Sequence, residues 1–137
     1  MRIVIIDDSL TNTAVMAALA RSLSADVTTY RCPLAALDRI SDDEADVIIV
    51  DFSMPGMDGV VLTERLRQPA LYPGTPILMV THEGSTGVRL RARAAGVTGF
   101  LRKPFDAIEF KATLRRLSDG VVRHSSQTDA HLIPQEA

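Results

Sequence analysis

Cysteine and long apolar runs are scarce in this sequence. Cys32 is its single cysteine, which excludes an internal disulfide and suits a reducing compartment. No apolar run approaches the ~20 residues that a bilayer-spanning helix needs. The apolar segment at residues 3–6 is too short for a signal peptide. We therefore expect a cytoplasmic protein that does not insert into a membrane.

An excess of charge of one sign is also absent. The formal net charge is −2, so we expect no direct binding of nucleic acid and no general attraction to anionic lipid. Hydrophobic residues make up 46% and charged residues 23% of the chain, which is ordinary for a soluble globular protein. A length of 137 residues predicts one domain that buries roughly two-thirds of its unfolded surface.

Short apolar runs alternate with helix-like segments along the chain. Residues 27–30 form a weak, alternating run that suits the edge of a sheet. The other runs are rich in β-branched residues, as is typical of strands buried on both faces of a parallel sheet; they span residues 3–6, 47–50, 77–80 and 98–101. Helices are expected near residues 10–23, 33–40, 59–67, 86–95 and 105–117. This order predicts an α/β fold with a doubly wound, five-stranded parallel sheet and helices on both of its faces.

Several residues mark the ends and faces of these helices. Ser9 can cap the first helix, and Gly96 suits a left-handed cap at the end of the fourth. The apolar stripe of the first helix is predicted to be Ala14, Val15, Ala18, Leu19 and Leu23. The last helix offers for burial Phe105, Ile108, Phe110, Ala112, Leu114 and Leu117.

The composition changes from residue 118 onward. Residues 125–137 are polar and aperiodic, a pattern that favours a disordered segment. We therefore predict a folded domain over residues 1–119 and a flexible tail or linker over residues 120–137.

Polar and charged residues follow the predicted buried strands where each strand ends. Asp7 and Asp8 follow the first, Asp51 the third, Thr81 the fourth and Lys103 the fifth. The ligand crevice of an open α/β sheet lies outside the carboxyl ends of its strands, so these side chains are expected to meet there. Carboxylates about 4 Å apart repel by about 4 kcal/mol at an effective dielectric constant near 20. Such a cluster must take up protons or bind a cation.

The oxygen-rich donor set favours a hard divalent cation. Because no His or Cys belongs to the cluster, Mg²⁺, or Mn²⁺ as a substitute, fits better than Zn²⁺. Lys103 and Thr81 would help to bind phosphoryl oxygens beside the metal. Asp51 would then be the nucleophile, because carboxylates can form aspartyl phosphates. Positioning and charge neutralisation are most of what phosphoryl transfer requires.

Four segments of the sequence resemble the receiver domain of bacterial two-component response regulators. The resemblance extends over about residues 2–118, and the matching segments are VIIDDS (residues 4–9), VDFSMPGMDG (50–59), VT (80–81) and FLRKPF (100–105). It implies a flavodoxin-like (βα)5 fold. It also implies a switch that is phosphorylated on Asp51 and slowly loses the phosphoryl group, rather than a conventional enzyme.

The resemblance implies roles for the site residues. Asp8 and Asp51 would ligate Mg²⁺ directly, Asp7 would act mainly through water, and Ser53 would contribute its backbone carbonyl. Thr81 and Phe100 match the family's switch pair, in which the hydroxyl moves toward the phosphoryl group and the aromatic ring follows inward. In this family the bond between Lys103 and Pro104 is cis. His82 stands where the family usually has a small residue, so entry of phosphodonors or of water to the pocket is expected to be slower.

The resemblance also implies partners. The phosphoryl donor would be a sensor histidine kinase or a phosphotransfer protein, and a homodimer would form through the fourth helix, fifth strand and fifth helix. Because little sequence follows residue 118, the output would come from a partner, from dimerisation, or from a further domain of a longer regulator. Residues 99–110 are similar to receivers fused to HD-GYP cyclic-di-GMP phosphodiesterases, and a DNA-binding output domain is a further alternative.

Two alternatives belong to other functional classes. Phosphatases of the haloacid dehalogenase type also use an aspartate nucleophile and Mg²⁺ on an α/β sheet. Their nucleophile lies in an Asp-x-Asp motif after the first strand, whereas this chain has Asp7-Asp8-Ser9 there and no room for a cap domain. An adaptor that keeps the fold but ignores phosphodonors is the other alternative.

Overall fold

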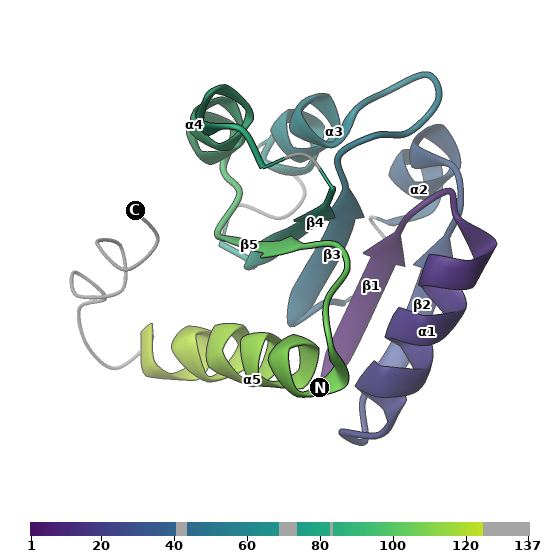
Figure 1. The fold of residues 1–137 in the computed structure, drawn as a ribbon, viewed down its shortest axis with the longest axis vertical. Helices are drawn as coiled ribbons and strands as arrows, with labels where there is room; N and C mark the ends of the chain where they lie inside the picture. The colour runs from purple at the N-terminus through teal and green to yellow at the C-terminus, as the bar shows by residue number, and fades with distance from the viewer. Residues whose placement is uncertain (41–43, 69–73, 83, 125–137) are drawn as a thin grey trace.

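A five-stranded parallel sheet forms the centre of the molecule (Figure 1). The structure, a computed structural model, describes residues 1–40, 44–68, 74–82 and 84–124. The strands, all paired in parallel, are β1 (Arg2–Ile6), β2 (Asp26–Tyr30), β3 (Val47–Asp51), β4 (Ile77–Thr81) and β5 (Gly99–Arg102). Their order across the sheet is β2-β1-β3-β4-β5. The predicted fold class is confirmed, and β2 lies at an edge as expected.

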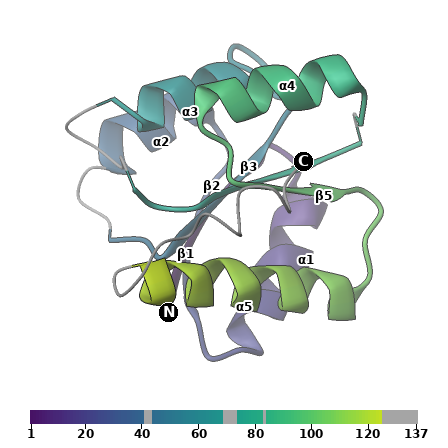
Figure 2. The same ribbon diagram turned by 90° about the vertical axis from the view of Figure 1, so that its left-hand side faces the viewer.

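Helices cover both faces of the sheet. They are α1 (Leu10–Arg21), α2 (Pro33–Arg39), α3 (Gly59–Leu66), α4 (Thr86–Ala95) and α5 (Ala107–His124). Helices α1 and α5 lie on one face, and α2, α3 and α4 lie on the other (Figures 1 and 2). Within the described residues, no helix combines the length and apolar character that crossing a bilayer requires.

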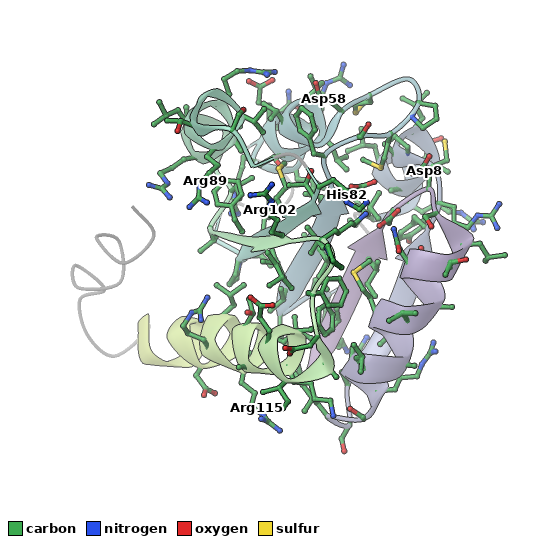
Figure 3. The ribbon with its side chains drawn as sticks, in the orientation of Figure 1. Asp8, Asp58, His82, Arg89, Arg102 and Arg115 are labelled. Atoms are coloured by element: carbon green, nitrogen blue, oxygen red, sulfur yellow. The ribbon has the colours of Figure 1, made fainter. Side chains whose placement is uncertain are left out.

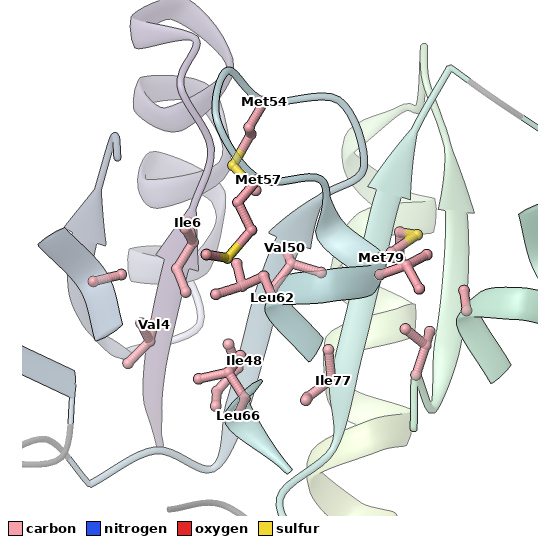
Figure 4. Close-up of a cluster of buried hydrophobic side chains, with 14 of the residues drawn as sticks. Val4, Ile6, Ile48, Val50, Met54, Met57, Leu62, Leu66, Ile77 and Met79 are labelled. Atoms are coloured by element: carbon pink, nitrogen blue, oxygen red, sulfur yellow. The ribbon is translucent and has the colours of Figure 1, made fainter. Parts of the chain in front are cut away.

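The buried strands send alternate side chains to opposite faces of the sheet. On β1, Ile3 and Ile5 pack against α1 and α5, whereas Val4 and Ile6 join the cluster beneath α2 and α3 (Figure 4). This alternation with a period of two gives the protein two apolar layers, one on each face. Met54 and Met57, from the loop after β3, pack into the second layer as well.

The buried face of α1 agrees only in part with the predicted stripe. Leu19 and Leu23 pack against the apolar layer as predicted, but Val15 is 46% exposed, and Ala14 and Ala18 are exposed too. The residues that the helix buries are Thr13, Met16, Ala17 and Ala20. The prediction was wrong for the three exposed residues because α1 carries apolar residues on every side, so its sequence period does not define one face. The position of Thr13 is fixed by a hydrogen bond that its Oγ1 donates to the carbonyl oxygen of Asp7 over 3.1 Å.

Helix α5 is also longer than predicted, and two of the apolar residues expected to be buried are exposed. Phe110, Leu114 and Leu117 are buried as expected, but Ile108 is 81% exposed and Ala112 is exposed too. The helix continues to His124 instead of ending near residue 117, since a single glycine costs a helix only about 1 kcal/mol. Residues 125–137 lie outside the part of the chain that the structure describes. The predicted division into a domain over residues 1–119 and a tail or linker over residues 120–137 therefore stays a prediction.

Helix α4 is fixed at its carboxyl end by α3. Gly96 caps α4 with φ of 116°, as predicted. Its carbonyl oxygen accepts hydrogen bonds from Nη2 and Nε of Arg67, over 2.7 and 3.2 Å. Burial lowers the pKa of Arg67. These contacts hold the carboxyl ends of α3 and α4 together, so a displacement of α4 is expected to involve its other end.

Gly59 at the start of α3 lies against the backbone of the β3 carboxyl end. A Cβ atom here would lie 2.5 Å from the Asp51 carbonyl oxygen and 3.0 Å from the Phe52 Cα. We expect Gly59→Ala to lower the free energy of unfolding by about 1–3 kcal/mol, since backbone atoms must shift. Gly87→Ala is the matched control, because nothing lies within 4 Å of its added Cβ. Urea unfolding measures both, and equal stability of Gly59→Ala and wild type would refute the prediction.

Candidate functional site

The predicted site residues come together at the carboxyl end of the sheet. Strand β1 lies between β2 and β3. The chain therefore continues from β1 to the strand on one side of it, β2, and then crosses to the strand on its other side, β3. A crevice forms at such a point in a doubly wound sheet. Asp7 and Asp8 follow β1, Asp51 and Thr81 end β3 and β4, and Lys103 follows β5.

Lys103 joins two of the carboxylates. Its Nζ lies 3.2 Å from Oδ1 of Asp51 and 3.3 Å from Oδ2 of Asp7. Asp7, Asp51 and Lys103 are 1%, 7% and 8% exposed. A buried ammonium between two buried carboxylates is costly to desolvate and is weak support for stability alone. The arrangement therefore points to chemistry rather than to folding.

Backbone and helix contacts fix Asp7 in the pocket. Its Oδ1 accepts a hydrogen bond from the backbone N–H of Ser9 over 2.9 Å. Ser9 in turn caps α1, as predicted, and its hydroxyl accepts from the N–H of Asn12 over 3.2 Å. With Thr13 holding the Asp7 carbonyl, the start of α1 positions this carboxylate toward Lys103.

Asp8 completes a set of three acidic groups. Asp7, Asp8 and Asp51 each offer a carboxylate oxygen, and these oxygens lie within 4.8 Å of one another. Asp8 is exposed, so a cation can approach from solvent. Hard oxygen donors at this spacing fit Mg²⁺ or Mn²⁺. One ammonium leaves the cluster with an excess of negative charge that a divalent ion would neutralise.

The pKa of the Asp51 carboxyl is raised above its ordinary value. Burial is the largest cause, followed by the charge of Asp7, while the charge of Lys103 and its hydrogen bond act in the opposite direction. Folding therefore favours the protonated form of Asp51. A proton and a metal ion then compete for this carboxylate as the pH falls.

This raised pKa predicts how stability depends on pH. A carboxyl that binds its proton more tightly when folded stabilises the fold below its unfolded pKa, and that contribution is lost as the pH rises through the folded value. We expect the stability of Asp51→Asn relative to wild type to increase from about pH 4 to about pH 7. Urea unfolding in EDTA measures this difference, and a difference that stays constant or decreases would contradict the stated direction.

Thr81 lies beside this cluster on the neighbouring strand. Asp51 pairs with Val80 in the register of β3 and β4, so Thr81 comes one position further toward the carboxyl end. It is buried, and its carbonyl oxygen accepts a hydrogen bond from the Lys103 backbone N–H over 2.9 Å. That bond ties the hydroxyl-bearing residue to the lysine that reaches Asp51.

Three further predicted features lie around the pocket. Ser53 is exposed in the loop after β3, and His82 is exposed directly after Thr81. Figure 3 places His82 and Asp8 at the same end of the sheet. The Lys103–Pro104 peptide bond is cis, as the family resemblance implied. The proposed role of the Ser53 carbonyl stays a prediction.

Two arginine contacts near the site were not predicted from the sequence. The Arg89 guanidinium lies over the ring of Phe100, with Cζ 5.1 Å from the ring centroid. A Cβ on Gly84 would lie 2.9–3.1 Å from three atoms of the Arg102 guanidinium, so that group covers the loop before α4. The sequence shows that an arginine, Arg102, follows the apolar residues of β5, but it does not indicate in which direction the side chain of Arg102 points.

Comparison with known proteins agrees with the geometry of this site. The family model of the response regulator receiver domain matches residues 3–115. The chain belongs to the response regulator receiver family. This assignment confirms the predicted resemblance and favours a receiver over the haloacid dehalogenase alternative. Receiver domains are signalling switches rather than conventional enzymes.

Individual relatives cover the receiver to different extents. The chemotaxis protein CheY-3 of Vibrio cholerae is 32% identical over 118 residues, covering 85% of this chain and 91% of that protein. The cyclic di-GMP phosphodiesterase response regulator RpfG of Xanthomonas campestris is 29% identical over 141 residues, covering 97% of this chain. That match spans 37% of RpfG, so this chain corresponds to about a third of its length.

A solved receiver structure resembles the fold closely. The receiver domain of the sensor histidine kinase PA1611 from Pseudomonas aeruginosa superposes with a TM-score of 0.78 at 28% identity, covering 86% of this chain and 97% of that one. That structure contains a magnesium ion coordinated in the active-site cleft. The comparison supports the flavodoxin-like receiver fold of this chain.

Proposed function

We propose that this receiver accepts a phosphoryl group on Asp51 from a phosphohistidine. Receiver domains of this type interact with histidine kinases or phosphotransfer proteins, and either class supplies such a donor. An oxygen of the Asp51 carboxylate attacks phosphorus, a P–O bond forms, and the P–N bond to the donor imidazole breaks with its electron pair on nitrogen. The observation that carries the proposal is the Lys103 ammonium, which lies within 3.3 Å of both Asp51 and Asp7.

Magnesium fits the acidic cluster as the cofactor. Asp8 and Asp51 would hold it directly, Asp7 through water, and Ser53 through its backbone carbonyl, with Mn²⁺ as a substitute. When bound, the ion supplies charge neutralisation at the phosphoryl oxygens. The magnesium ion described for the PA1611 receiver supports this assignment.

Lys103 and Thr81 would recognise the transferred group. The ammonium, already 3.2 Å from Asp51 Oδ1, is placed to donate to a phosphoryl oxygen. The Thr81 hydroxyl would donate to another, and Phe100 would follow it inward, which changes the surface formed by α4 and β5. The chain would thus act as a phosphorylation-controlled switch that slowly hydrolyses its own phosphoryl group.

Phosphorylation by a small donor tests this function. The purified chain is incubated with acetyl phosphate and Mg²⁺, and intact mass spectrometry measures the addition of one phosphoryl group. Stable labelling of the chain is expected, whereas continuous turnover of a phosphate ester would favour a phosphatase. A chain that gains no phosphoryl group and shows no spectral change with beryllofluoride would refute the switch and favour an adaptor.

The exposed imidazole of His82 predicts slow chemistry at the pocket. We expect His82→Ala to take up the phosphoryl group from acetyl phosphate faster and to lose it faster, because a smaller side chain opens the entrance to donor and water. Quench-flow labelling and the decay of the phosphorylated form measure the two rates. If His82→Ala takes up and loses the phosphoryl group at the wild-type rates, His82 does not limit access to the pocket.

The output of the switch is proposed from the same relatives. The similarity to RpfG favours a receiver that controls an HD-GYP cyclic-di-GMP phosphodiesterase in a longer cytoplasmic regulator, and a DNA-binding output remains the alternative. Phosphorylation would act through a homodimer that uses α4, β5 and α5. Gel filtration with and without beryllofluoride tests this dimer, and a monomer under both conditions would refute it.

A further inference from the structure

A cation–π contact joins α4 to β5 next to the switch residues. Arg89 is exposed on α4, and its guanidinium carbon lies 5.1 Å from the centroid of the Phe100 ring. The ring is half-buried and packs against the apolar layer beneath α3 and α4. Figure 3 shows Arg89 on α4 and Arg102 on β5, with both side chains lying between these two elements.

The strand register connects this contact to the phosphorylation pocket. Met79 pairs with Phe100, and Thr81 pairs with Arg102. Paired residues, and residues two apart on one strand, project from the same face of a sheet. Phe100 and Thr81 therefore lie on the same face of the sheet, on neighbouring strands, so a movement of Thr81 changes the space on the face that the ring occupies.

The cation–π contact with Arg89 favours one position of the Phe100 ring over the other. A half-exposed ring beneath a guanidinium has one face in contact with the cation, and moving the ring inward separates the two. Arg67 fixes only the carboxyl end of α4, and Arg89 lies near the other end of the helix. A ring that moves inward therefore either loses the contact or has to displace the amino end of α4 with it. The contact therefore favours the outward position over the inward one.

We propose that Arg89 is a positioning residue that holds Phe100 outward and thereby opposes the switch. The inference rests on the proposed function, because it assigns the inward movement of Phe100 to phosphorylation. Arg89 thus lowers the apparent affinity of the pocket for a phosphoryl group, although it belongs to α4 and follows Thr81 by eight positions. The effect corresponds to the strength of a cation–π contact at an exposed site, about two- to fivefold.

Beryllofluoride titration of matched variants tests this role. Arg89→Met keeps much of the aliphatic stem and removes the charge, and it is expected to bind beryllofluoride about two- to fivefold more tightly than wild type. Arg91→Met is the control, because that neighbouring arginine contacts Asp58 at 3.9 Å on the exposed surface. In a Phe100→Leu background, Arg89→Met is expected to have no further effect.

Each outcome of the titration decides the proposal. Equal or weaker binding by Arg89→Met, when wild type binds beryllofluoride, overturns the role of Arg89 and leaves the proposed function standing. A similar gain in Arg91→Met overturns it too, because the effect would then be one of general charge. A gain that persists in the Phe100→Leu background excludes the ring as the intermediary.

A measurement on the free protein separates this inference from the proposed function. NMR of the Phe100 ring resonances reports the position of the ring without any phosphoryl mimic. Arg89→Met is expected to shift these resonances, and Arg91→Met is expected to leave them unchanged. If the resonances do not move, Arg89 does not hold the ring. If they move while wild type fails to bind beryllofluoride, the contact is real and the proposed function is the part that fails.

Discussion

Asp51→Asn is expected to abolish phosphorylation while the fold persists. A carboxylate oxygen is the attacking atom in the proposed reaction, and a neutral amide of nearly the same size is a far weaker nucleophile. Loss of a nucleophile that acts together with its neighbours lowers the rate by orders of magnitude, so we expect labelling by acetyl phosphate to slow by at least about 1,000-fold. Intact mass spectrometry of the reacted chain measures the loss.

Asp58→Asn is the matched control for this experiment. Asp58 lies in the same loop, and its side chain accepts a hydrogen bond from the N–H of Val61 over 2.9 Å as the cap of α3. Asparagine caps a helix about as well as aspartate, so this variant is expected to keep wild-type labelling. Labelled Asp51→Asn, or unlabelled Asp58→Asn, would show that the acceptor lies elsewhere.

The location of the site was predictable from the sequence because a parallel sheet orders its strand ends. The runs before Asp7, Asp51 and Thr81 are continuous and β-branched, a pattern that depends on burial of both faces and needs little knowledge of tertiary contacts. Once the strands lie in parallel, their carboxyl ends meet. The contacts of Lys103 with Asp7 and Asp51 then follow from topology.

Side-chain direction on the helices and at the sheet edge was not predictable in the same way. Helix α1 has apolar residues around its whole circumference, and the face that it buries includes Thr13, whose hydroxyl donates to the Asp7 carbonyl oxygen. The contact of Arg89 with Phe100 depends on the distance between α4 and β5. Both depend on the packing of elements distant in the chain, which local sequence periods do not encode.

Lys103→Met is expected to have the largest effect on stability, and Mg²⁺ is expected to reverse much of it. Without the ammonium, the buried carboxylates of Asp7 and Asp51 lose their partner. Removing one member of a buried ion pair typically costs about 3–5 kcal/mol. We therefore expect urea unfolding in EDTA to show a loss of about 3 kcal/mol relative to wild type. Lys111→Met on α5, the other lysine of the sequence, is the control and is expected to stay near wild type.

Adding Mg²⁺ then separates a metal-binding cluster from an ordinary buried ion pair. A ligand at about 100 times its dissociation constant stabilises the folded state by about 2.7 kcal/mol, and the gain of Lys103→Met should exceed that of wild type because the ion replaces the missing positive charge. Asp8→Asn should reduce the gain in both backgrounds, since it removes the exposed oxygen ligand. If Mg²⁺ stabilises neither protein, the three carboxylates do not form a divalent-ion site, and the proposed phosphoryl chemistry at Asp51 loses its cofactor.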